Sequence, residues 1–595
     1  MMDRTKKILG AGLFLVIGAL CLRCLFDVGR FYRDFRPVLG RGIRTIPKEE
    51  LAYAAWFMLL GSLAALALCF GLYRTRLPDR LQAGFAALCR RSRGLLVALP
   101  VAVFLVVAGF RAFVLLDAPV ADDESTYVLI AQTLQQGRVV NPVPEDNELF
   151  TNNFVVMNQH GWFGKYPIGH PLVMAMADLV GARFFVGPLL TALAVLLTFA
   201  IGRSVFGPRT AVLGVLLLAV SPHFLLTGAT LLSQTTATVC MLAGLFFTIR
   251  FMESGRSSFG ALAGSCFAFG VLTRPLPGVL FGIGAFAIVA LQPCGPGLLD
   301  RVRRRARGLA LFAGCVGLAG GVLLLVNLEQ TGSLLRTAYH EVHGPHLGIG
   351  STSVGQRSMS VAAALLRENL WLFGWPVSLL FIGFVRRNRF FPLLAAMVAA
   401  EVIYRAVAPK TVVSSTGPIY TTEVVPLLAL ATASGMAEVK HRLAALGVRR
   451  PEGGLVSLGC SFTVVALVCF WPVQLAGLQR GARLWRFPYQ ALEQQHVARA
   501  LVFADRMVNP ALSATWAYYP PNPSPSLDDD VLFVRIPRKP RDTVAAMREF
   551  HRRRYPDRPA FYLDLDGTRA ALLPLGALTE LGPASRGGKE GLPDG

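Results

Sequence analysis

Charged residues are scarce in this sequence. Only 16% of its 595 residues are Asp, Glu, Lys or Arg, and of these 36 are acidic and 59 are basic. With 53% hydrophobic residues and a mean hydropathy of +0.50, the chain is too apolar for a soluble protein of this length. The composition therefore predicts a membrane protein. Its apolar runs are expected to cross the bilayer as helices, because backbone polar groups in lipid must be bonded within their own segment.

The sequence also lacks a metal or redox cysteine motif, and it has no short-period repeat. Its ten cysteines lie mostly inside apolar runs, and Cys21-x-x-Cys24 has no partner pair, so packing is the preferred interpretation. The net charge of +23 could indicate nucleic-acid binding. However, Lys and Arg cluster in short loops between apolar runs, which is the positive-inside pattern of membrane proteins. We therefore expect no nucleic-acid partner.

Thirteen apolar runs are candidate membrane spans. They cover residues 8–27, 51–73, 95–116, 184–202, 210–228, 233–251, 260–272, 276–292, 308–327, 369–385, 390–408, 419–437 and 455–474. The runs 260–272 and 276–292 are short for a span. The amino-terminal run 8–27 is expected to remain in the protein as an uncleaved span. With the amino end inside, most basic loops fall on the cytoplasmic side, although the Arg-containing loop 28–50 does not.

This topology places three large pieces outside, at 117–183, 328–368 and after about 475. The predicted regions are two N-terminal transmembrane helices with a basic loop (1–94), a transmembrane module (95–475), an external α/β domain (476–582) and a disordered tail (583–595). The α/β domain contains the Pro-rich stretch 520–525, followed by a strand (531–536), a helix (543–554) and a second strand (560–565). Its external position makes it a candidate acceptor-binding or partner surface.

Three adjacent acids, Asp122-Asp123-Glu124, follow the apolar run 95–116 directly. An acid at this interface can act on the headgroup of a lipid whose tail stays in the bilayer. Residues 125–136 then form the pattern of an amphipathic interfacial helix that ends at Gly137. The structural alternative is N-capping, which Asp favours, but a cap requires one Asp and does not explain three acids. We therefore expect a catalytic role, first for Asp123, then for Glu124 and Asp122.

The same loop continues through His160, Lys165, Tyr166 and His170. Lys165 is a compact cation that can pair with a phosphate, and the alternative is an ordinary interfacial lysine. A second external loop, residues 339–346, holds three His and one Glu that could bind a divalent metal ion. Its spacing fits no zinc motif and its Gly-Pro argues against a helix. The preferred interpretation is a polar loop near the active site, and the metal question stays open.

Several short motifs follow one another in a definite order. They are Asp123-Glu124-x-x-Tyr127, Lys165-Tyr166-Pro167-x-Gly169, Arg203-x-x-Phe206-Gly207, Ser233-Gln234-Thr235-Thr236, Leu272-Thr273-Arg274-Pro275 and Gly417-Pro418-x-Tyr420-x-x-Glu423-x-x-Pro426. This order resembles the GT-C class of membrane glycosyltransferases. The resemblance is to the branch that holds protein mannosyltransferases (bacterial glycosyltransferase family 39) and the lipid A aminoarabinose transferase, and it covers about residues 95–475.

The resemblance implies a GT-C-like fold and an enzyme of the bacterial inner membrane. Its donor would be a polyprenyl-phosphate sugar used at the outer face, and its acceptor a lipid, a glycan or a protein. In that family an Asp after the first core span is the catalytic base, which corresponds to Asp123, and basic residues hold the donor phosphate. The phosphate-binding residues would be Lys165, Arg274 and the adjacent Tyr166. The active-site or acceptor loops would contribute His160, His170, Tyr339, His340, His343, Tyr420 and Glu423.

Two positions depart from the pattern of the family. Ile419 stands where a bacterial subgroup of the family has the Arg of its Gly-Pro-Arg-Tyr element, and Ile168 follows Pro167 where a second Pro is usual. A transporter or flippase of lipid-linked substrates is the alternative function, because polar residues such as Gln234 lie inside apolar runs. A transporter would place its ionisable groups near mid-membrane and show two similar halves. The acids here lie at an interface and no such halves are visible, so an enzyme is the preferred interpretation.

Overall fold

The computed structural model describes residues 12–25, 48–119, 121–152, 154–291, 298–343, 353–407, 416–504, 507–508, 517–518, 521–537, 543–565 and 570–579. The predicted tail, 583–595, lies outside them. The chain divides into two compact units. We call residues 1–110, 187–320 and 351–477 the helical unit, and residues 111–186, 321–350 and 478–595 the loop unit.

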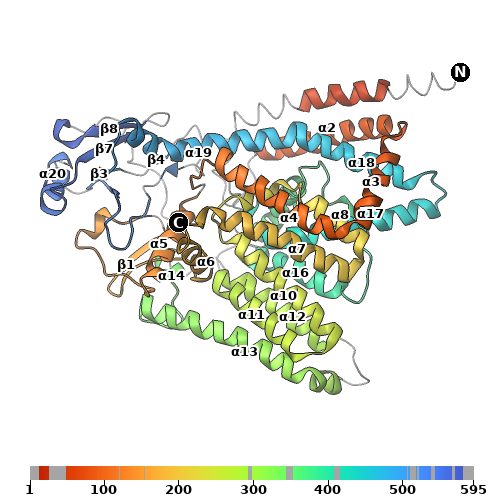
Figure 1. The fold of residues 1–595 in the computed structure, drawn as a ribbon, viewed down its shortest axis with the longest axis horizontal. Helices are drawn as coiled ribbons and strands as arrows, with labels where there is room; N and C mark the ends of the chain where they lie inside the picture. The colour runs from red at the N-terminus through yellow and green to blue at the C-terminus, as the bar shows by residue number, and fades with distance from the viewer. Residues whose placement is uncertain are drawn as a thin grey trace. The chain divides into compact units, whose positions relative to one another are not determined.

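The helical unit is a bundle of apolar helices, in which α10, α11 and α12 lie side by side (Figure 1). Helix α17 packs on α8, and α18 packs on α2. The bounds are α2 Lys48–Tyr73, α3 Leu77–Arg90, α4 Ser92–Gly109, α7 Val186–Phe206, α8 Pro208–Leu218, α9 Pro222–Gly228, α10 Gln234–Ser254, α11 Ser257–Thr273, α12 Pro275–Leu291, α13 Leu298–Thr331, α15 Val354–Trp371, α16 Phe391–Val407, α17 Val425–Ala445, α18 Pro451–Val465 and α19 Trp471–Gln494. Helices α7, α13 and α19 continue into the loop unit.

Seven helices of the described chain are long and apolar enough to cross a membrane, or eight when the pair α8 and α9, bent by 63°, counts as one. Four shorter apolar helices accompany them, Gly12–Leu25, Ser257–Thr273, Pro275–Leu291 and Phe391–Tyr404. The helical membrane fold is thus confirmed, but the count of thirteen spans is not.

The predicted span 369–385 is wrong. Helix α15 ends at Trp371, and a short 3-10 turn at Leu380–Phe384 is the only helical piece of the remainder. Gly374 takes a positive φ of 69°, and Pro376 follows it. The Asn369 side chain then holds the turn, donating to the Pro376 carbonyl (2.8 Å) and accepting from the Leu379 N–H (3.2 Å). Glycine and proline thus break the helix that the apolarity of this run predicts.

The loop unit contains α5 Asp122–Gln135, β1 Val155–Asn158, β2 Gly161–Gly164, α6 Gly169–Asp178 and α14 Ala338–His343. Strands β1 and β2 form an antiparallel hairpin, and α14 packs on β1 through a small core around Val156, Phe163 and Ala338. Helix α14 contradicts the expectation that the loop 339–346 is not helical, at least for residues up to His343, and its Gly-Pro pair lies outside the described residues.

A four-stranded sheet lies in the carboxyl-terminal part of the loop unit, in the order β6-β3-β7-β8. Its members are β3 Ala500–Phe503, β6 Val531–Val534, β7 Ala560–Leu565 and β8 Ala570–Pro574, and α20 Thr543–Arg554 packs with them (Figure 1). Strand β3 is parallel to both β6 and β7, while β8 is antiparallel to β7. The predicted α/β elements are confirmed. The compact unit that holds them also includes 111–186 and 321–350.

Candidate active site

The three acids form the first turn of α5. The residue before the helix, Ala121, makes no side-chain cap, and Asp122 begins the helix. The main-chain carbonyl of Asp122 accepts hydrogen bonds from Ser125 Oγ (2.9 Å) and Thr126 Oγ1 (3.2 Å). The N-cap position is thus held by Ala121, and Asp122 and Asp123 lie inside the helix. Negative charge near a helix N-terminus is nevertheless stabilised by the helix dipole.

Helix α5 is a core helix of the loop unit. Buried residues occur on more than one of its faces, since Tyr127, Ile130 and Ala131 are buried and so are Leu129 and Thr133. Its amphipathic stripe is therefore covered by protein, which differs from the predicted helix lying on a membrane surface. The helix ends at Gln135, two residues before the expected Gly137, which takes a φ of 70°.

A glycine lets this helix approach the β1–β2 hairpin. A Cβ on Gly164 would lie 2.7 Å from the Thr126 Cγ2 and 2.8 Å from the Ile130 Cδ1, both on α5. These distances are shorter than side chains tolerate, so only glycine permits the contact. Since Lys165 follows Gly164 directly, the close approach brings this lysine to the first turn of α5.

Lys165 is buried among aromatic rings. Its side chain has 5% exposure, and its Nζ lies 3.1 Å from the ring centroid of Phe154, 4.9 Å from that of Tyr166 and 5.2 Å from that of Tyr339. A desolvated cation over aromatic faces is held by their negative electrostatic potential. Phe154 has a positive φ of 64°, and its carbonyl accepts the Lys165 N–H (2.9 Å), so a strained residue fixes this cage.

The electrostatics of Asp123 fit those of a general base. Burial, and after it the neighbouring charge of Asp122, raises the pKa of Asp123 to about 7, while the Lys165 ammonium acts in the opposite direction. A carboxyl group with this pKa is partly ionised at neutral pH, and it is a far stronger base than an exposed aspartate. Glu124 is more deeply buried, with 3% exposure.

The structure brings several of the other predicted residues to the same place. Tyr166 contacts Tyr127, with ring centroids 4.6 Å apart, and Tyr339, at 5.8 Å. The buried His170 packs edge-on to Tyr127 at 5.0 Å. His160 is exposed at the β1–β2 turn, where Asn158 Oδ1 accepts its main-chain N–H (2.8 Å). His160 is therefore on the outside of the hairpin, away from the aromatic cage.

The candidate metal loop holds different contacts. His340 Nδ1 accepts from the Thr337 N–H (3.1 Å), and Glu341 pairs with Arg336 (2.6 Å). His343 ends α14, and residues 344–346 lie outside the described part of the chain. Within that described part, no group of three or more His, Cys, Asp or Glu side chains could hold a metal ion.

Three further predicted residues meet inside the helical unit. Arg274 lies between α11 and α12, and its Nε is 3.1 Å from the Glu423 Oε1. Its guanidinium also lies over the Tyr420 ring, 5.4 Å from the centroid. The segment Ile419–Val424 is a 3-10 turn in which Ile419 is buried. The apolar side chain at position 419 thus lies in the protein interior. The positive charge near this turn comes from Arg274, which is paired with Glu423.

A buried His–Glu pair beside this turn was missed by sequence reasoning. His223 Nδ1 lies 3.2 Å from a Glu368 oxygen, and its Nε2 lies 3.1 Å from Thr422 Oγ1. Thr421 Oγ1 donates to Glu368 Oε2, the same oxygen, at 2.5 Å. His223 and Glu368 are 145 residues apart and neither belongs to a motif, so the pattern of the sequence carried no signal for them.

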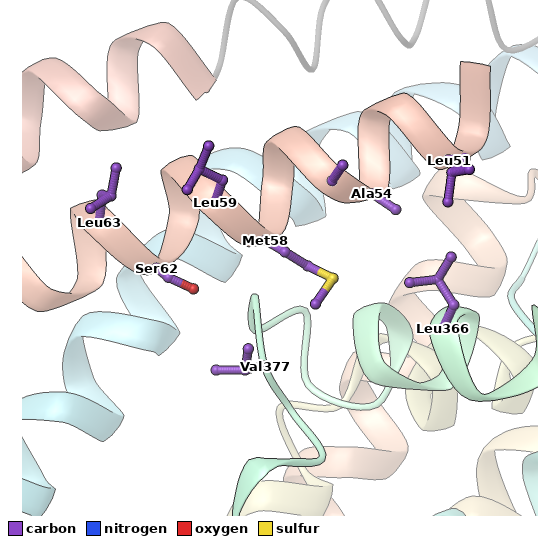
Figure 2. Close-up of a pocket in the computed structure, with 9 residues that line it drawn as sticks. Leu51, Ala54, Met58, Leu59, Ser62, Leu63, Leu366 and Val377 are labelled. Atoms are coloured by element: carbon purple, nitrogen blue, oxygen red, sulfur yellow. The ribbon is translucent and has the colours of Figure 1, made fainter. Parts of the chain in front are cut away.

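The helical unit also contains an open apolar groove of about 590 Å³, between α2 and α15. Figure 2 shows Met58 and Leu51 on α2 pointing toward Val377 and Leu366. Ser62 is the single hydroxyl among its lining residues. This surface suits a hydrocarbon chain, and it offers no group for proton or sugar transfer.

Comparison with known proteins gives a family match in one part of the chain. Residues 170–315 match the model of the family described as dolichyl-phosphate-mannose-protein mannosyltransferase. Comparison with curated protein sequences gives no match. The family match confirms, for these residues, the predicted resemblance to the GT-C class.

Solved structures of low sequence identity are also similar. ArnT from Cupriavidus metallidurans, bound to undecaprenyl phosphate, shares 13% identity over 79% of this chain and 92% of its own, with a TM-score of 0.49. The apo oligosaccharyltransferase of Archaeoglobus fulgidus shares 13% over 68% and 62%, with a TM-score of 0.35. The arabinosyltransferase EmbB of Mycobacterium smegmatis shares 16% over 76% and 46%, with a TM-score of 0.36.

Proposed function

We propose that this protein is a membrane glycosyltransferase that takes a sugar from a polyprenyl-phosphate donor. The observation that carries the proposal is the pairing of Asp123, whose pKa is raised to about 7, with the buried cation of Lys165. Both lie between two candidate membrane spans, Arg93–Val114 and Arg183–Phe206. A donor whose tail stays in the bilayer would present its phosphate and sugar at the membrane surface, where the segment between these two spans would lie. The family match at 170–315 supports the same chemistry.

The reaction is a single displacement at the anomeric carbon. Asp123 takes the proton of an acceptor hydroxyl as the hydroxyl oxygen attacks that carbon. The bond from the anomeric carbon to the phosphate oxygen breaks, and the polyprenyl phosphate leaves with the electron pair. The anomeric centre inverts, through a transition state with oxocarbenium character. The Lys165 ammonium stabilises the charge that develops on the leaving phosphate.

The outer face of a bacterial inner membrane is the site at which this reaction would take place, and a lipid, a glycan or a protein would be its acceptor. Arg274 is proposed as a second phosphate ligand. Its partner Glu423 and the ring of Tyr420 would then hold the guanidinium in a fixed orientation until the donor arrives.

The decisive experiment measures release of free polyprenyl phosphate. The purified full-length protein in detergent is incubated with a panel of polyprenyl-phosphate sugars and a crude envelope extract as acceptor. Wild type is compared with Asp123→Asn, and Glu148→Gln, an exposed acid in the same loop, is the matched control. We expect release by wild type and by Glu148→Gln, and a loss of about 100-fold or more in Asp123→Asn, the usual scale for general-base catalysis.

Other outcomes would redirect the proposal. Equal release by wild type and Asp123→Asn would exclude Asp123 as the base and turn attention to Asp122 and Glu124. Binding of the lipids without release from any donor would favour the transporter or flippase. In that case, reconstituted vesicles should show movement of the labelled lipid between leaflets.

A further inference from the structure

The carboxyl-terminal sheet shares its hydrophobic core with the first external loop. Leu149 and Phe150, between α5 and β1, are buried in one cluster with Phe503, Val534 and other sheet residues, and Met157 packs against it. The Phe150 and Phe550 rings lie 6.3 Å apart, edge to face. Two loop residues with about 5% exposure each would be bared to water if the sheet were removed.

The loop occupies an edge of the sheet where such folds often bind ligands. Ligands of parallel α/β sheets lie beyond the carboxyl ends of the strands. Here Arg535, directly after β6, donates its main-chain N–H to the Leu149 carbonyl (2.8 Å) and its Nη1 to the Thr151 carbonyl (3.4 Å). At β6, this edge is therefore covered by a segment of the same chain.

An ion-pair cluster fastens the segment a few residues earlier. Arg554, at the end of α20, places its Nε 3.0 Å from Asp146 Oδ2 and also pairs with Glu145. Arg553 pairs with Asp146 as well. Charges shared in a network of this kind fix geometry more strongly than a single surface pair does.

A third contact reaches the first turn of α5. Asn522 Nδ2 donates to Ser125 Oγ (3.2 Å), and Ser125 Oγ in turn donates to the Asp122 carbonyl (2.9 Å). Because the Ser125 proton is used in the second bond, the amide group of Asn522 must be the donor in the first, which sets its orientation. The loop that carries Asn522 is braced by Pro521, Pro523 and a bond from the Ser524 N–H to Asp529 Oδ2 (2.7 Å).

We infer that the carboxyl-terminal sheet is an internal clamp. It holds the segment that carries Asp123, from the first turn of α5 to Thr151, in the geometry that catalysis requires. Asn522 is the positioning residue and acts through Ser125. This inference rests on the proposed glycosyl transfer for its effect on rate. At β6 the edge of the sheet is occupied by the chain itself, which favours this role over ligand binding at that edge. Asn522 touches the turn that carries the base, so its loss should affect catalysis more than donor binding.

The test uses the full chain with Asn522→Leu, which keeps the size of the side chain and removes its donor. Ser526→Ala is the matched control, because it breaks a hydrogen bond to Asp528 in the same loop (2.6 Å) without touching α5. We expect amide hydrogen exchange in residues 122–126 to quicken about 10-fold, the effect of losing roughly 1.4 kcal/mol of local stability. We expect kcat to fall by a similar factor while KM for the donor stays within twofold.

Ser125→Ala removes this bond and also the bond to the Asp122 carbonyl, so its effect should be at least as large as that of Asn522→Leu, and the double variant should be no worse than Ser125→Ala alone. Unchanged exchange and kcat in Asn522→Leu would overturn the inference. So would a general loss of stability with kcat and KM affected together, because a purely structural role predicts that result. If wild type transfers no sugar, the proposed function fails, while hydrogen exchange still decides whether the clamp exists.

Discussion

The ionisation of Asp123 should set the pH dependence of sugar transfer. The ionised carboxylate is the base, so kcat/KM should rise with pH and level off above a pKa of about 7. Two neighbours act on this group with opposite sign. Removing the Asp122 charge with Asp122→Asn should lower the pKa of Asp123 and move the profile to lower pH. Removing the cation with Lys165→Met should move it to higher pH.

The expected size follows from the position of the pKa on the titration curve. With a pKa of about 7, roughly one Asp123 in eleven is ionised at pH 6. If Asp122→Asn lowers the pKa by about one unit, which corresponds to ~1.4 kcal/mol, about half of the molecules are ionised at that pH. The rate at pH 6, taken relative to each variant's own plateau, should therefore rise about fivefold.

The assay is the initial rate of polyprenyl phosphate release between pH 5 and pH 9, at donor concentrations below KM. Lys165→Arg keeps the charge and serves as the control for Lys165→Met, which should also lower the plateau by weakening phosphate stabilisation. Shifts of the two variants in the same direction, or a flat profile in wild type, would refute the assignment of Asp123 as the titrating base.

Three further predictions concern stability. Burial penalises the ionised form of Asp123, so this residue destabilises the fold as pH rises from about 4 to 7. Asp123→Asn should therefore raise the free energy of unfolding at pH 8, by at most ~4 kcal/mol, and leave it unchanged at pH 4, as measured by thermal unfolding. Gly164→Ala should cost about 1–3 kcal/mol in thermal unfolding, because its Cβ would press on α5, whereas Gly84→Ala, with open space around it, should cost nothing. His223→Ala leaves the Glu368 carboxylate buried without this partner and should cost about 3–5 kcal/mol in chemical denaturation; a cost below 1 kcal/mol would show that the pair contributes little.

Local elements were predictable wherever short-range patterns decide them. The helix Thr543–Arg554 and the strand Ala560–Leu565 have the bounds expected from their periodicity, and α5 differs at its start by three residues. The prediction of a span at 369–385 was wrong because it rested on the mean apolarity of the run, whereas the glycine and proline inside the run decide its conformation. An apolar run without regular periodicity shows how long a buried segment is, but it does not show whether that segment is a helix.

Within the described residues, only part of the candidate site could be predicted from the sequence. Asp123 and Lys165 could be chosen from residue type and spacing, and the structure brings both to the first turn of α5. Phe154, Asn522, His223 and Glu368 could not be chosen, because nothing in their own neighbourhoods distinguishes them. Asn522 reaches Ser125 across 397 residues, and a contact of that span leaves no trace in a single sequence.

The sequence by itself determined that this chain is a helical membrane protein with acids and a lysine in one loop, since composition and periodicity act through local burial. Only the tertiary structure decided that Asp123 has a raised pKa, that Lys165 lies in an aromatic cage and that the carboxyl-terminal sheet encloses Leu149 and Phe150. Each of these depends on the distance between segments far apart in the chain. That distance is set by packing, for example by the missing side chain of Gly164, and the free energy that sets it is a property of the whole fold.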